Sequence, residues 1–139
     1  MKLTNEQFTE AAFIFEKANG NFLDDYEEKL IATSHLTKFN ITELEMIIID
    51  GLNSGIYEKE EERVSGYWSL SKLGNRNLIK EYKKWLRTEL ESKSEIAVFQ
   101  ILVGLDRLEE STFNKNRSGR AVDESELNFR DAEKYLSQE

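Results

Sequence analysis

The chain of 139 residues contains no cysteine, no proline and a single histidine. Without cysteine it can form neither a disulfide nor a thiolate metal site, so nothing in its composition requires an oxidising compartment. Proline, about 5% of an average protein, would interrupt helices, and its absence leaves them uninterrupted. These absences favour a helical protein in the reducing cytoplasm.

The lone histidine, His35, leaves little room for familiar catalytic arrangements. On a helix, a metal-binding histidine needs carboxylates three or four positions away. The residues at those positions are Ile31, Ala32, Lys38 and Phe39. Ser34 would point about 100° away from His35, which prevents a nucleophile and base pair, and no glycine-rich phosphate-binding motif is present. The sequence therefore predicts no catalytic residue, no metal and no cofactor, and we expect the protein not to be an enzyme.

Long apolar runs are also missing, since no segment approaches the roughly 20 residues that cross a bilayer. The first six residues lack the apolar run of a secretion signal and include an acidic residue, so we expect neither a leader nor membrane attachment. The formal charge is −8, with ten acidic and four basic residues in 1–57 against seventeen and fifteen in 58–139. This balance disfavours nucleic acid as a partner and favours a basic protein.

What the sequence does contain is apolar spacing and capping residues typical of helices, and a length sufficient for one core. We predict an all-α single domain over 1–139 with about seven helices. The expected helices cover 5–18, 24–38, one from near 42 to 52, one opening at 58, 78–92, 95–113, and a last one after 123. The pairs that predict capping boxes are Thr4 with Gln7, Thr42 with Glu45, Ser92 with Glu95, and Asp123 with Glu126.

Some further details belong to this prediction, and two of them leave alternatives open. Residues 47–49 are three consecutive isoleucines, which favour a helix in this context but are also compatible with a short buried strand. The helix over 95–113 is apolar nearly all round and should be the central one. Trp68 is expected in the core, whereas Trp85 lies beside a basic stripe and fits a core or a partner anchor equally well.

A short pattern recurs along the chain. Leu70-x-x-Leu73 returns as Leu105-x-x-Leu108 at a period of 35, close to the length of a two-helix repeat. Two copies favour stacked antiparallel helix pairs resembling HEAT-like repeats, a scaffold that presents a surface for recognition.

The C-terminal half also resembles a known family. The segments that carry the likeness are Trp68–Gly74, Leu86–Leu90, Leu102–Leu108 and Asn128–Leu136. They resemble small helical immunity proteins of bacterial polymorphic-toxin and contact-dependent growth-inhibition systems. The resemblance implies a cytoplasmic protein that binds one cognate toxin domain and blocks its active site, and it supplies no catalytic residue.

An acidic inhibitor would suit a basic toxin such as a nuclease, because it can mimic phosphates and speed association. We therefore place the predicted interface on two acidic clusters. The partner-binding candidates are Glu58, Glu60, Glu61, Glu62, Asp123, Glu124 and Glu126. A helical adaptor or scaffold, or a small enzyme using paired carboxylates, remains an alternative. The stripe Lys80, Lys83, Lys84 and Arg87 is interpreted as a solvated helix face rather than a nucleic-acid site.

Overall fold

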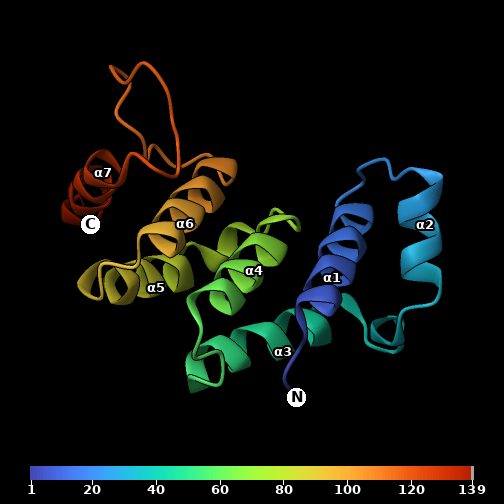
Figure 1. Cartoon of the computed structure of the whole chain (residues 1–139). Coiled ribbons are helices and arrows are strands. Elements are labelled where there is room, and N and C mark those ends of the chain that lie inside the picture. Colours follow the sequence, from blue (N-terminus) through green and yellow to red (C-terminus); the bar gives the residue numbers. More distant parts are fainter. Residues whose placement is uncertain (139) are drawn as a thin grey trace. The chain divides into compact units, whose positions relative to one another are not determined.

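In the computed structural model, which describes residues 1–138, every regular element is a helix (Figure 1). The seven α-helices are α1 Asn5–Ala18, α2 Asp25–Ala32, α3 Ile41–Ser54, α4 Glu60–Ser71, α5 Ile79–Glu91, α6 Glu95–Arg107 and α7 Ser125–Ser137. Two short 3-10 helices, His35–Lys38 and Arg76–Leu78, join them. The predicted all-α class is confirmed.

Contacts between residues divide the chain into two compact units, Met1–Gly74 and Asn75–Glu139. The expected single domain stays a prediction. The two copies of the 35-residue pattern fall in different units, and their first leucines, Leu70 and Leu105, are both buried. No helix in residues 1–138 has both the length and the apolar character to span a bilayer.

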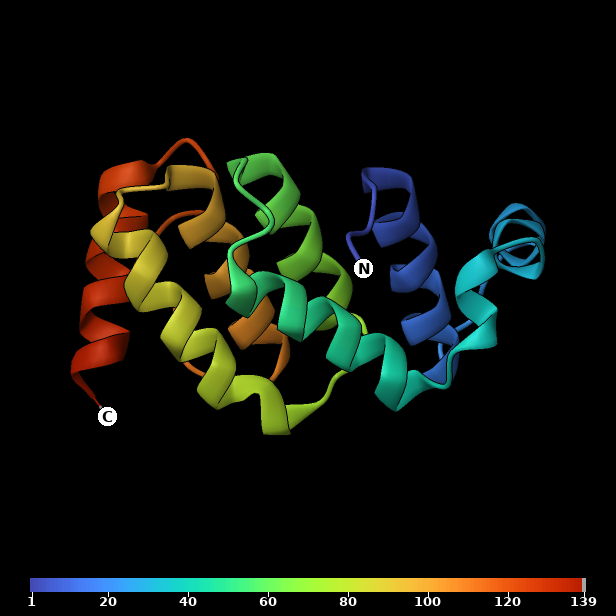
Figure 2. The ribbon, with the colours of Figure 1, turned by 90° about the horizontal axis from the view of Figure 1, so that it is seen from below.

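In the first unit, α1 lies between α4 and α2 (Figures 1 and 2). Its start is the predicted one, because Thr4 and Gln7 form a capping box. Phe8 and Phe15 of α1 are fully buried, and the Phe8 ring meets Tyr57 with centroids 5.3 Å apart. The hydroxyl of Tyr57 accepts a hydrogen bond from the Leu3 backbone N–H at 3.0 Å. Tyr57 thereby connects the residues before α1 to the loop before α4.

Two predicted features of this unit need correction and one ambiguity is resolved. The second helix ends at Ala32, because Ser34 caps a separate 3-10 helix through its bond to the Leu36 N–H. The third helix is capped by Asn40 with Glu43, two residues earlier than expected. Residues 47–49 are helical.

In the second unit, α5, α6 and α7 all pack against one another, and α5 and α6 form an antiparallel pair (Figure 2). Tyr82, Leu86, Val98, Ile101 and Leu102 are completely buried between them.

The ends of α6 and α7 differ from the sequence prediction. Helix α6 stops at Arg107 rather than at residue 113, and Glu109 beyond it takes a left-handed conformation with φ 67°. The caps of α6 and α7 are Ser94 and Glu124, neither with a side-chain capping bond, so both predicted boxes are wrong. Ile96 is 51% exposed, so α6 is not buried all round.

Of the two tryptophans, Trp68 departs from the expected core position, and the alternatives left open for Trp85 are resolved in favour of the core. Trp85 is 5% exposed and meets the Tyr82 ring edge-on at 5.5 Å, whereas Trp68 is only half-buried under the Lys72 ammonium, 5.4 Å from its ring centre. Trp85 thus belongs to the core of the second unit.

Candidate partner-binding surfaces

The first predicted acidic cluster forms the start of α4. Glu58 and Glu61 are exposed, while Glu60 and Glu62 are partly covered. Glu62 accepts a bond from the Lys59 backbone N–H at 3.2 Å and an ion pair from Lys2 at 3.2 Å. Chiefly the backbone bond, and then Lys2, lower the pKa of Glu62. Glu62 therefore stabilises the start of α4, and Glu58 and Glu61 are the members of this cluster that are exposed to solvent.

The second predicted cluster precedes and opens α7. Asp123 and Glu126 are exposed, but Glu124 turns back to the loop before it. Its Oε1 accepts from the Ala121 backbone N–H at 3.1 Å and from Arg117 Nη2 at 3.2 Å. This cluster is thus partly neutralised by its own loop. The two clusters belong to different units.

Sequence reasoning missed the role of Arg117. Its side chain is 5% exposed and its Nη1 donates to Asp131 Oδ2 and Asn128 Oδ1, both at 2.9 Å. The guanidinium also lies over the Phe113 ring, 5.5 Å from its centre. A buried arginine needs such partners because an unpaired buried charge is strongly destabilising. The only signal in the sequence for this buried network was the spacing of Asn128 and Asp131, which lie three residues apart on one helix.

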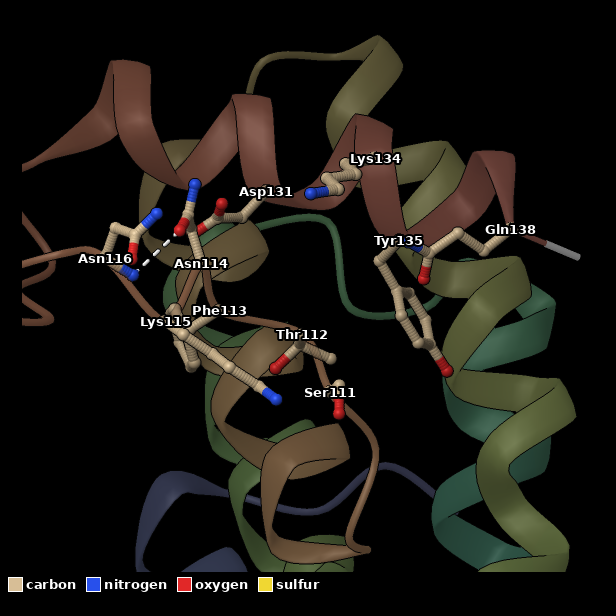
Figure 3. Close-up of a pocket in the computed structure, with 10 residues that line it drawn as sticks. All are labelled: Ser111, Thr112, Phe113, Asn114, Lys115, Asn116, Asp131, Lys134, Tyr135 and Gln138. Atoms are coloured by element: carbon tan, nitrogen blue, oxygen red, sulfur yellow. Dashed lines mark hydrogen bonds between the residues drawn. The ribbon is translucent and has the colours of Figure 1, made fainter.

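Beside this network, a pocket of about 350 Å³ separates α7 from the segment 111–116 (Figure 3). Asp131, Lys134 and Tyr135 line it from α7, and Gln138 lines it from the position directly after this helix. Hydroxyl, amide, ammonium and carboxylate groups all face it, and Asp131 is already engaged by Arg117. The pocket therefore offers mixed polar contacts rather than one kind of functional group.

Tyr135 closes one side of this pocket and is fixed by two neighbours. Its hydroxyl donates to Glu110 Oε1 at 2.7 Å, and the Lys83 ammonium lies 5.3 Å from its ring centre. Burial first, and then the hydrogen bond to Glu110, raise the pKa of Tyr135. Arg76 binds the same Glu110 at 3.6 Å and donates to the Leu108 carbonyl. The hydroxyl therefore serves as a structural donor that joins α7 to the segment after α6.

The basic stripe of α5 borders a shallow hollow of about 570 Å³. Its cationic lining residues are Arg76, Lys80, Lys83 and Arg87. Three of the nearby cations are engaged within the unit: Arg76 with Glu110, Lys83 with the Tyr135 ring, and Lys84 with Glu81. These contacts support the interpretation of the stripe as a solvated face.

A third acidic region, which sequence reasoning did not select, surrounds the start of α2. Phe22 is 90% exposed and Tyr26 is 71% exposed, and Asp24, Asp25 and Glu27 lie in the same short segment. Large exposed aromatic side chains are unusual on a protein surface unless a partner covers them. The available signal was the presence of two aromatic residues among three acidic ones at 22–27.

The described residues 1–138 contain no group of three or more His, Asp or Glu side chains placed to hold a metal ion. His35 is exposed on its 3-10 helix. No family model, curated protein or solved structure matches this chain.

Proposed function

We propose that this chain is a bacterial immunity protein that binds and neutralises one cognate toxin domain through an acidic surface, without transforming a substrate itself. The observation that carries the proposal is the distribution of charge. Met1–Gly74 contains fourteen acidic and seven basic residues, a net charge of −7, whereas Asn75–Glu139 contains thirteen and twelve, a net charge of −1. Nearly all of the excess negative charge belongs to one unit.

Such a unit suits a basic partner. A nuclease toxin needs positive charge around its active site to hold phosphates. A complementary negative potential speeds encounter with that site and disfavours neutral or acidic competitors. The first unit combines this potential with well-defined helix starts, since α1 and α3 both begin with a capping box. A rigid surface loses little conformational freedom on binding.

The proposal is tested by co-expressing the chain with the protein encoded beside its gene, with an affinity tag on the neighbour only. We expect the two proteins to purify as a one-to-one complex and cells carrying both to survive expression of the neighbour. Recovery of the neighbour alone from viable cells, or toxicity that the chain does not relieve, would contradict the proposal. A stable complex without any protection would instead support the adaptor alternative.

A further inference from the structure

We propose that the start of α2 is the face that receives the basic partner, with the Phe22 and Tyr26 rings each accepting a lysine or arginine side chain. We call Phe22, Asp24, Asp25, Tyr26 and Glu27 the α2 surface. This assignment rests on the proposed function for the identity of the partner, but its chemistry can be tested separately.

The exposure of the two rings is the first argument. Phe22 and Tyr26 are the most exposed large hydrophobic residues in the described chain, at 90% and 71%, and they lie four residues apart on either side of the helix start. The other exposed large hydrophobics are aliphatic residues, Met1, Met46, Ile56, Ile96 and Val122. Aromatic rings left in water are costly, and they are the side chains that most often dominate binding interfaces.

This segment is held in place by buried residues while the Phe22 and Tyr26 rings remain exposed to solvent. Leu23 and Ile31 are buried and anchor the segment from the inner side. Asp24 accepts the Glu27 backbone N–H at 2.8 Å, and Glu27 returns the bond at 3.0 Å, which forms a capping box. The helix lies alongside α1 (Figure 1), so the opposite side faces away from the core of the unit. The exposed rings therefore belong to a defined surface.

The charge of this surface favours a partner that presents cationic side chains. Residues 22–29 include Asp24, Asp25, Glu27 and Glu28 against Lys29 alone. Of the four acids only Glu28 has a basic partner within the unit, Lys17 at 2.9 Å. A guanidinium or ammonium placed over an aromatic face is attracted by the ring, and nearby carboxylates strengthen its binding. An acidic or purely apolar partner would meet repulsion or unpaired carboxylates here.

In each of the two acidic clusters expected from the sequence, one carboxylate is engaged within its own unit. Glu62 is taken up by Lys2 and by the start of α4, and Glu124 is taken up by Arg117. Neither cluster contains an aromatic ring comparably exposed. Both stay predicted contacts, but of these three acidic regions only the α2 surface places an exposed carboxylate, that of Asp25, close in the chain to large exposed rings.

The experiment titrates the full-length chain, labelled with nitrogen-15, with a deca-arginine peptide and maps the shifted amide signals. We expect the largest shifts at residues 22–28. The double variant Phe22→Ala/Tyr26→Ala should bind the peptide about tenfold more weakly, because two cation–π contacts are lost. Ile96→Ala is the control for removing an exposed apolar side chain and should bind like the unchanged protein. Asp25→Asn should weaken binding more than Asp50→Asn, which removes an exposed charge from α3.

Shifts centred on residues 58–62 or 123–126, or a double variant that binds unchanged, would overturn the assignment. So would a dimer in light scattering that the double variant converts to a monomer, because the rings would then bind a second copy. None of these outcomes would contradict the proposed function if the chain still neutralised the protein encoded beside its gene. Failure to neutralise the neighbour, with the peptide still bound at 22–28, would overturn the function and retain the surface.

Discussion

Arg117 and Arg120 show how burial determines the contribution of an ion pair to the stability of the protein. Both guanidinium groups lie over the Phe113 ring and both bind an aspartate, Asp131 for Arg117 and Asp106 for Arg120. The Arg117 side chain is 5% exposed and the Arg120 side chain is 49% exposed. Water already solvates the second pair, whereas the first has only protein partners.

Replacing Arg117 with methionine should therefore lower the free energy of unfolding by about 3–5 kcal/mol, because Asp131 and Asn128 lose their buried donor. The same change at Arg120 should cost no more than about 1 kcal/mol. Urea denaturation of both variants measures the difference. Equal losses would show that the buried pair has no special structural role.

Tyr135 gives a pH dependence whose sign follows from its surroundings. Burial and the Glu110 acceptor raise the pKa of the folded-state hydroxyl, while the unfolded chain releases that proton near its ordinary value of about 10. The stabilisation is complete below about pH 10 and is lost as the pH rises further, because the unfolded state then holds fewer protons.

We expect the melting temperature to fall between pH 9 and pH 11, and to fall less in Tyr135→Phe, which has no such proton. At pH 7 this variant should lose about 1 kcal/mol from the missing hydrogen bond. Thermal melts across this pH range provide the measurement. If the melting temperature of the variant fell as much as that of the unchanged protein, Tyr135 would not be the source of the alkaline sensitivity. Tyr57, whose pKa is also raised by burial, would then be the next residue to replace.

At the scale of elements, the close approach of α3 to the loop before α4 depends on Gly51. A Cβ built at Gly51 would lie 2.6 Å from the Tyr57 ring, which is itself fixed by Phe8 and by the Leu3 N–H. At Gly66 in α4, by contrast, the nearest atom is a flexible methyl of Leu52 at 3.2 Å.

Gly51→Ala should destabilise the protein by about 1–3 kcal/mol, because overpacking outweighs the better helix propensity of alanine. Gly66→Ala is the matched helical control and should be close to neutral or slightly stabilising. Guanidinium denaturation distinguishes the two. Equal stability of both variants would mean that the Tyr57 ring can move aside at little cost.

The elements also show what local sequence could and could not predict. The box of Thr4 and Gln7 was found because a cap followed by its partner three residues later is a local signal. The break after Ala32 was missed, because Ser34 caps a second short helix within the range 24–38 that was expected to form one helix. Trp85 was left open because its burial depends on how α5 packs against the other helices of its unit, which local spacing does not specify.

At the scale of the whole chain, the unequal distribution of charge was predicted from the sequence, since residues 1–57 carry a net charge of −6 and residues 58–139 carry −2. The boundary at Gly74 assigns this difference to two compact units, with net charges of −7 and −1. The acidic clusters expected at 58–62 and 123–126 were chosen from runs of like residues. The α2 surface was missed because exposure of Phe22 and Tyr26 depends on tertiary packing.

This charge distribution predicts a marked salt dependence of partner binding. The rate of association with the neighbour-encoded protein should fall at least about tenfold between 50 and 500 mM NaCl, since mobile ions screen the attraction over a few ångströms at high salt. Dissociation should change much less. Stopped-flow association at several salt concentrations provides the test, and a rate independent of salt would contradict steering by the first unit.

The most direct test of the account is to titrate the purified neighbour-encoded protein with this chain while following the neighbour's own toxic activity. The account predicts a linear loss of that activity, complete at one equivalent of chain, with the Phe22→Ala/Tyr26→Ala variant requiring an excess. Full activity of the neighbour in the presence of a large molar excess of the unchanged chain would contradict it.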